Sequence, residues 1–161
     1  MKKKIFMLLL CFMSAAGASA QFEKGKYYVN AGFSGFDLNY QNEWNFGINA
    51  KAGYMFTDDV MVLADGLWNI RQHNPNDFRL GAGLRYYIVQ NGLYLGAGAR
   101  YKHASCIDDF MPNVNVGYAF FLNKTVTLEP ELYFDFSTKN FKDYSDFGLR
   151  IGIGIYFDTL F

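Results

Sequence analysis

An alternating stretch at the end of the chain, residues 146–161 (DFGLRIGIGIYFDTLF), limits the possible folds more than any other feature. Large apolar residues such as Leu149, Ile151 and Ile153 occupy every second position, and glycines and Arg150 fall between them. A period of two is that of a β-strand, because successive side chains of a strand point to opposite faces. This strand therefore separates an apolar from a polar environment, as a membrane-barrel strand does between lipid and lumen.

Seven more alternating segments precede the last one, with polar turns between them. They cover Lys26–Asp37, Trp44–Phe56, Val60–Arg71, Phe78–Val89, Leu93–Lys102, Phe110–Leu122 and Val126–Ser137. Most have 10–13 residues, and a tilted membrane strand needs roughly 9–11. Tight turns at 57–59, 90–92 and 123–125 alternate with longer connections at 72–77, 103–109 and 138–145. The sequence thus predicts an all-β fold, an eight-stranded antiparallel up-and-down transmembrane β-barrel with longer outer loops.

A proline interrupts one of these segments. Pro130 lies inside Val126–Ser137, where it cannot donate a hydrogen bond to the ladder. A closed barrel has no free edge to accommodate it, so we expect a bulge or a local bend there.

The glycines indicate which face of the strands is inside. Of the 16 glycines, 11 lie on the polar face: Gly32, Gly47, Gly53, Gly81, Gly83, Gly96, Gly98, Gly117, Gly148, Gly152 and Gly154. A water-facing strand surface disfavours glycine, which weakens strands, whereas a narrow lumen needs small residues beside long ones. A soluble lipocalin-like binding barrel, with the apolar face inside, is the alternative built from the same strands.

The apolar face is aliphatic in its middle and aromatic at its ends. One predicted belt holds Trp44, Phe46, Trp68, Phe78, Tyr101, Phe110, Phe136 and Phe147. The other holds Tyr27, Tyr54, Phe56, Tyr86, Tyr118, Phe120 and Phe157. Membrane barrels carry such aromatic girdles at both bilayer interfaces, whereas a soluble core has no reason for this order. Lipid is therefore expected outside and a polar lumen inside.

The predicted lumen face carries ten charged residues. They are Lys51, Asp65, Arg79, Arg85, Arg100, Lys102, Glu129, Glu131, Asp135 and Arg150. Charges in so small an interior must pair, because each unpaired one costs several kcal/mol. We expect a structural salt-bridge network that plugs the lumen, with Arg150 next to Glu131 and Asp135 on the adjacent strand. A narrow pore or channel for ions or protons is the alternative.

The first twenty residues have the pattern of a secretory signal peptide. A basic start, Lys2–Lys4, precedes the short apolar run Ile5–Met13 and the small-residue cleavage pattern Ala18–Ala20. The predicted mature chain, 21–161, is one barrel domain by length. Without the three lysines it has 12 basic and 15 acidic residues, which is no nucleic-acid signature. Its single cysteine, Cys106, allows no internal disulfide, and we expect no metal site or cofactor.

One pair of residues has the spacing of a reactive site. His103 and Ser105 lie two positions apart at the expected outer rim, so a base could reach a nucleophile. Small membrane barrels that deacylate lipid A carry a similar His-x-Ser, which makes a lipid A-modifying hydrolase a further alternative. In that family an acidic residue follows about a dozen positions later, and Gly117 stands there in this chain. We therefore expect no enzymatic activity.

The mature chain as a whole resembles the small outer-membrane β-barrel family of OmpA and OmpX. The resemblance is carried by Lys51–Phe56, Gly81–Tyr87, Leu128–Glu131 and the last strand. In that strand Arg150, Gly152, Ile155 and Phe157 are similar to the C-terminal signal that the outer-membrane assembly machinery reads, and Phe161 is a further candidate at the chain end.

The resemblance implies where such a chain resides and what it meets. It implies a monomer in the bacterial outer membrane, exported with removal of its signal peptide. The implied partners are outer-membrane lipid, lipopolysaccharide and the assembly machinery, and the implied role is structural or one of surface interaction. Family members differ in activity, so the resemblance implies no single one.

Overall fold

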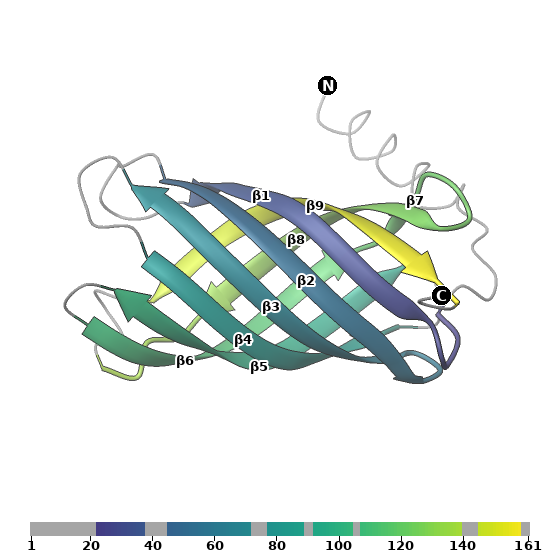
Figure 1. Cartoon of the computed structure of the whole chain (residues 1–161), viewed down its shortest axis with the longest axis horizontal. Coiled ribbons are helices and arrows are strands. Elements are labelled where there is room, and N and C mark those ends of the chain that lie inside the picture. Colours follow the sequence, from purple (N-terminus) through teal and green to yellow (C-terminus); the bar gives the residue numbers. More distant parts are fainter. Residues whose placement is uncertain are drawn as a thin grey trace, which may run out of the picture.

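A computed structural model describes residues 22–37, 45–71, 77–88, 92–104, 107–139 and 145–158. They form a closed antiparallel β-barrel with steeply tilted strands (Figure 1). The strands are β1 (Tyr27–Asp37), β2 (Asn45–Thr57), β3 (Val60–Arg71), β4 (Asp77–Tyr87), β5 (Leu93–Ala104), β6 (Ile107–Tyr118), β7 (Phe120–Phe121), β8 (Val126–Asp135) and β9 (Asp146–Phe157). Strands that follow one another in sequence pair, except that β6 and β7 both pair with β8, and β1 pairs with β9 to close the barrel.

The predicted eight-stranded barrel is confirmed, although nine strands carry labels. The short β7 continues the line of β6, since both pair with β8. No helix in the described ranges is long and apolar enough to cross a membrane.

The break between β6 and β7 lies opposite Pro130. Gly117 pairs with Glu131 and Phe120 pairs with Leu128, so the register is the same on both sides of the break. The pairing of β8 with β9 runs through Pro130 opposite Ile151 without a shift. Because proline has no N–H to donate, the ladder toward β6 is interrupted there. The expected bulge was wrong: the ladder has a gap, and its register is kept.

The connection between β5 and β6 is shorter than expected. The predicted long connection at 103–109 is wrong, because β5 runs to Ala104 and β6 starts at Ile107. His103 lies opposite Asp108 in the ladder, and its Nδ1 lies 2.6 Å from the Asp108 Oδ1. Backbone pairing needs no apolar side chains, so these polar residues extend the hairpin where polarity suggested a loop.

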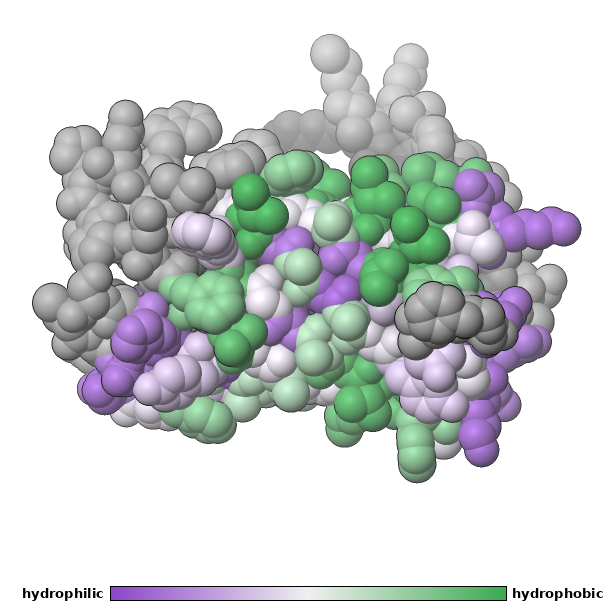
Figure 2. Space-filling model, viewed as in Figure 1, coloured by the Kyte–Doolittle hydropathy of each residue, from purple (hydrophilic) through white to green (hydrophobic). Residues whose placement is uncertain are grey.

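The outer face of the barrel is apolar. Trp68 is 58% exposed and Leu84 56%, and the exposed large hydrophobic residues alternate with buried polar ones along most strands. In Figure 2 apolar and weakly polar residues cover much of the visible strands, and hydrophilic residues stand at the two ends and show in places between the apolar ones. The soluble lipocalin-like alternative, which requires the apolar face inside, is therefore contradicted.

Most aromatic residues of the two predicted belts lie on this outer face, with one exception. Tyr118 is only 9% exposed, because the strand breaks after it and the Phe120 ring folds to a centroid distance of 4.3 Å from its own. The side chain of Phe46 and the whole of Trp44 lie outside the part of the chain that is described.

The tight turns share one end of the barrel, which we call the turn end; it lies at the right in Figure 1. Asp59 and Gly92 adopt positive φ, 71° and 94°, in two of these turns. In the third turn the Asn123 Oδ1 accepts hydrogen bonds from the backbone N–H groups of Thr125 and Val126, both at 2.8 Å. β1 starts and β9 ends at the same end as these turns.

Candidate functional site

The candidate site is the charged interior of the barrel, and β8 supplies its acceptors. Alternation along β8 points Glu129, Glu131 and Asp135 inward, and all three are buried. The outward positions between them carry Pro130, Leu132 and Phe134, which do not compete for polar partners. One strand thus forms an acidic strip along the lumen.

Cations reach this strip from several other strands. Lys51 comes from β2, Arg79 and Arg85 from β4, Arg100 from β5 and Arg150 from β9. All five cations are buried. Five carboxylates lie within ion-pair distance of them: Asp65, Glu129, Glu131, Asp135 and Asp146. The five positive and five negative charges of this set balance, with Asp65 only partly buried. Such a balance is the condition for holding charges in a low-dielectric interior.

Asp135 gathers three guanidinium groups. Its Oδ1 accepts from the Arg100 Nη1 at 2.5 Å, and its Oδ2 from the Arg79 Nη1 at 3.2 Å. The Arg150 Nη2 lies 3.5 Å from the same Oδ2. Each of these arginines also has a second carboxylate. Arg100 Nε donates to Asp65 at 2.6 Å, and Arg79 Nη2 donates to Asp146 at 2.5 Å. For Arg150 the second carboxylate is Glu131.

Glu131 gathers a lysine and two arginines. Its Oε2 accepts from the Lys51 Nζ at 2.6 Å, and the Arg85 Nη2 lies 3.5 Å from the same oxygen. The Arg150 Nη1 donates to Oε1 at 3.5 Å, so Arg150 bridges Glu131 and Asp135. The Arg150 guanidinium carbon also lies 3.4 Å from the centroid of the Tyr133 ring, a cation–π contact.

Glu129 and Arg85 form the third group, toward the turn end. The Arg85 Nη1 donates to the Glu129 Oε2 at 3.0 Å, and its guanidinium carbon lies 3.9 Å from the Tyr94 ring centroid. The hydroxyls of Tyr28 and Tyr156 donate to the Glu129 oxygens at 2.5 and 3.1 Å. Tyrosines therefore surround this ion pair with both rings and hydroxyls.

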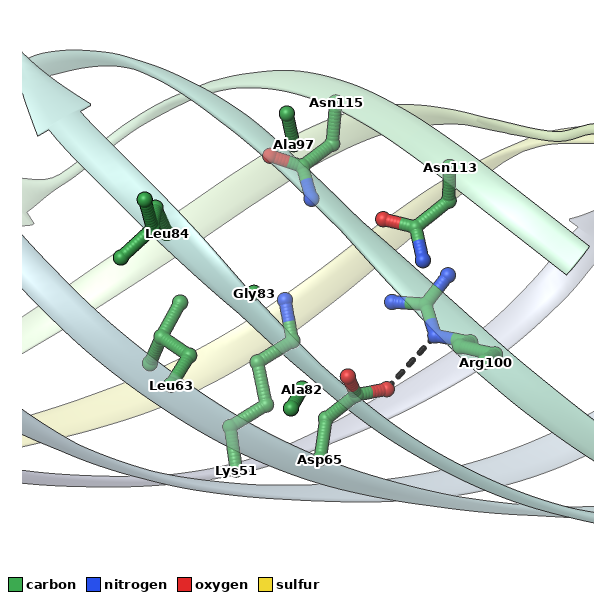
Figure 3. A pocket seen from close by; sticks show the side chains of 10 residues that line it. All are labelled: Lys51, Leu63, Asp65, Ala82, Gly83, Leu84, Ala97, Arg100, Asn113 and Asn115. Atoms are coloured by element: carbon green, nitrogen blue, oxygen red, sulfur yellow. Dashed lines mark hydrogen bonds and ion pairs between the residues drawn. The ribbon is translucent and has the colours of Figure 1, made fainter.

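A small cavity remains beside the network. Its volume is about 20 Å³, and it is lined by Lys51, Leu63, Asp65, Ala82, Gly83, Leu84, Ala97, Arg100, Asn113 and Asn115. Figure 3 shows Asp65 joined to Arg100, with the Lys51 side chain and two asparagines reaching into the same space. The buried Oδ1 of Asn115 has no hydrogen-bond partner among the described residues. A space this small with polar side chains on part of its wall suits a water molecule better than an organic ligand.

Nine of the ten charges predicted for the lumen belong to this network, and some other members of the network were not predicted. The tenth, Lys102, is half-buried on β5 opposite Arg79. Asp146 was missed, although its position two residues before Gly148 and four before Arg150 puts it on the same face. The tyrosines around Arg85 were also missed as site residues, because an aromatic on the lumen face gives no sign of which charge it will contact.

The reactive pair expected at the outer rim is only partly described. His103 and Asp108 are exposed and bonded to each other, whereas Ser105 and Cys106 lie outside the described ranges. Within those ranges no group of three or more histidine, cysteine and acidic residues could hold a metal ion.

Four of the five residues expected to form the assembly signal are described. Arg150 and Gly152 point into the lumen, where a Cβ on Gly152 would collide with the Asn30 side chain. Ile155 faces outward, and Phe157 lies opposite Tyr27 on β1 at a ring-centroid distance of 5.9 Å. Phe161 lies beyond the described residues.

Comparison with known proteins identifies the family. The family model described as outer membrane protein beta-barrel domain matches residues 5–160. The chain belongs to this outer membrane β-barrel family. Membership confirms the resemblance noted in the sequence and places the chain in the bacterial outer membrane. No curated protein matches it.

Solved structures of outer membrane barrels share the fold. The N-terminal β-barrel domain of OprF from Pseudomonas aeruginosa aligns with a TM-score of 0.67 and 14% identity, over 83% of this chain and 98% of that one. Neisserial surface protein A aligns with a TM-score of 0.60 and 18% identity, over 83% and 98%. Ail, the attachment invasion locus protein of Yersinia pestis, aligns with a TM-score of 0.56 and 14% identity, over 83% and 99%. At such identities the likeness concerns the fold alone.

Proposed function

We propose that this outer membrane β-barrel serves a structural or surface-interaction role, and that its side chains plug the lumen. The mature protein would be a monomer that starts at Gln21, after removal of residues 1–20. Its apolar outer face would contact membrane lipid and lipopolysaccharide. The assembly machinery would read Arg150, Gly152, Ile155 and Phe157 of the last strand, with Phe161.

The balanced ion network carries the proposal of a plugged lumen. Each of the three β8 carboxylates bonds to cations from other strands, so an ion that crossed the lumen would have to displace several buried pairs. Breaking one buried pair costs on the order of 3–5 kcal/mol. An eight-stranded barrel is narrow enough for side chains to fill it. Together these features favour a closed lumen over a pore.

A surface role is supported by the names of two relatives in fold. One is called a surface protein and the other an attachment invasion locus protein. Here the β5–β6 hairpin ends in a two-residue connection, so this hairpin would add little to a contact surface at the end opposite the tight turns.

Planar-bilayer recording tests the plugged lumen. The purified full-length protein should fold in detergent, migrate differently on gels with and without heating, and leave the bilayer silent. Steady unit conductance from the wild-type protein would establish the pore alternative. The control is a folded porin recorded in the same bilayers.

Lipid A hydrolysis is a second candidate because of one contact. The imidazole of His103 already has a carboxylate partner in Asp108, at 2.6 Å, which is how a general base is oriented. Mass spectrometry of lipid A from cells with and without the protein decides it. We expect no loss of acyl chains; a loss that Ser105→Ala abolishes would establish the hydrolase.

A further inference from the structure

A phenylalanine that precedes the first strand lies inside the barrel. Phe22 is five residues before Tyr27, where β1 starts, yet its exposed fraction is 0%. Its ring stacks on that of Tyr87 with a centroid distance of 3.8 Å and an interplanar angle of 17°. The rings of Phe121 and Tyr156 surround it at centroid distances of 5.5 and 5.6 Å. Phe22 therefore fills the lumen at the turn end.

Backbone hydrogen bonds hold the residues around Phe22 against the turn between β2 and β3. The Asp59 N–H donates to the Phe22 carbonyl at 3.1 Å. Farther along, the Gly25 N–H donates to the Met55 carbonyl at 2.9 Å, and the Met55 N–H donates to the Lys26 carbonyl at 2.8 Å. The segment is thus fastened at Phe22 itself and again at Gly25 and Lys26, so its position does not depend on one aromatic contact.

A glycine lets the chain fold back over the barrel end. Gly25 has a φ of 94°, and a Cβ placed there would meet nothing within 4 Å. Its role is therefore conformational and not steric, since only glycine adopts this φ readily. The Lys24 N–H next to it donates to the Asp58 Oδ1 at 2.9 Å, a further link to the same turn.

Phe22 covers the tyrosines that form hydrogen bonds with the Arg85–Glu129 pair deeper in the lumen. The Tyr87 hydroxyl accepts from the Arg85 Nη1 at 3.2 Å and lies 2.6 Å from the Tyr156 hydroxyl. The other buried residues of this layer are Tyr28, Met55, Met61, Leu63, Tyr94 and Ala119. An apolar layer with Phe22 in it therefore separates the Arg85–Glu129 pair from the turn end.

We propose that residues 22–26 are an intramolecular plug, and that Phe22 seals the lumen at the turn end by occupying an aromatic site that its own barrel provides. The plug keeps water at that end away from the ion network. The inference rests on the proposed plugged lumen, to which it adds the element that closes one end. With the plug unseated, the network would be open to water from the turn end.

Thiol reactivity in the sealed layer tests the plug. Met61→Cys, in a Cys106→Ser background, places a thiol in this layer, and Met111→Cys places one in the buried interior near the opposite end. Each full-length chain is expressed in cells, extracted in detergent and treated with a small charged methanethiosulfonate. Peptide mass spectrometry then gives the rate of modification at each cysteine.

Two changes should unseat the plug by different means. Phe22→Ala removes the ring, and Gly25→Pro keeps the ring but removes the donor N–H and the positive φ. Each should raise the rate at Met61→Cys by about tenfold or more, since local opening sets the reactivity of a buried group, and leave Met111→Cys unchanged. Phe22→Leu, which keeps an apolar side chain, and Lys24→Ala, which keeps the backbone donor, are the controls and should change little. Heat-modifiable migration verifies that each variant is folded.

Two results would overturn the plug. One is a rate of thiol modification at Met61→Cys that neither Phe22→Ala nor Gly25→Pro changes. The other is an equal rise at Met111→Cys, which means general loosening of the barrel. Conductance of the unmodified protein is recorded in parallel: a conducting wild type refutes the proposed function, whereas a silent wild type with unchanged labelling refutes the plug alone.

Discussion

The Lys51 Nζ lies 2.6 Å from the Glu131 Oε2, and the two residues stand on β2 and β8, which are not neighbours in the sheet. The contact therefore spans the lumen and joins opposite parts of the wall. The same carboxylate also meets Arg85 from β4 and Arg150 from β9. Backbone pairing connects only adjacent strands. Lys51 and Arg85 therefore add links that the ladder cannot, whereas Arg150 lies opposite Glu131 on the neighbouring strand.

Removing the Glu131 charge should destabilise the barrel strongly. Glu131→Gln leaves Lys51 without its carboxylate in a buried site, and we expect a loss of about 3–5 kcal/mol in the free energy of unfolding. The double variant Lys51→Met/Glu131→Gln should recover part of this loss, because it removes the stranded lysine as well. Urea unfolding in lipid vesicles measures both. Glu23→Gln, at an exposed position, is the control and should change the free energy of unfolding by no more than about 0.5 kcal/mol. An equally small change for Glu131→Gln would contradict the idea that Glu131 stabilises the barrel through its ion pairs.

A side chain on the glycine pair of β4 and β5 should be poorly tolerated. Gly98 lies opposite Gly83, and a Cβ on it would stand 2.5 Å from the Ala82 carbonyl oxygen and 2.8 Å from the Gly83 Cα. Gly98→Ala should therefore cost about 1–3 kcal/mol through overpacking.

Gly66→Ala is the matched glycine control, because Gly66 faces outward and its nearest atom, Leu80 Cδ2, is 3.8 Å from a built Cβ. We expect it to be neutral or to stabilise by about 0.4–1 kcal/mol. Denaturant midpoints of the folded barrels compare the two. Equal tolerance of both substitutions would argue against close approach of the strands.

The cost of a charge on the outer face should show where the bilayer lies along the barrel. Leu84 is 56% exposed on a membrane-spanning strand, and Leu122 is 65% exposed beside a tight turn. Leu84→Arg should cost about 2–4 kcal/mol, whereas Leu122→Arg should cost about 0–1 kcal/mol near the interface. Reversible unfolding from lipid bilayers measures the difference, and the reverse order would show that the membrane lies elsewhere on the barrel.

Loss of an aromatic side chain from the last strand should impair assembly in cells. Phe157→Ala removes a ring at the β1–β9 closure and, by our proposal, part of the signal that the assembly machinery reads. The amount of heat-modifiable protein in outer membranes should fall several-fold, while refolding of the purified chain in detergent stays close to normal. Deletion of Phe161 tests the alternative position of the signal. Defects of equal size in cells and in detergent would indicate a folding role instead.

Several parts of the fold could be predicted from local pattern alone. The period of two in eight segments, with glycine and charge on one face and aliphatic residues on the other, requires strands between lipid and a narrow lumen. The ends of strands were less predictable where polar residues continue a ladder, as His103 and Asp108 do. The gap opposite Pro130 kept its register, since β8 pairs with β6 before the gap and with β7 after it in the same alignment.

The sequence by itself determined that this chain is a membrane barrel and which charges enter its lumen, because alternation assigns each side chain to a face. Only the tertiary structure decided which charges meet. Lys51 and Glu131 are 80 residues apart and lie on non-adjacent strands, so closure and stagger of the barrel bring them together. The same holds for Phe22: residues 22–26 have no period, and only a closed barrel with an aromatic-lined end offers this ring a place to be buried.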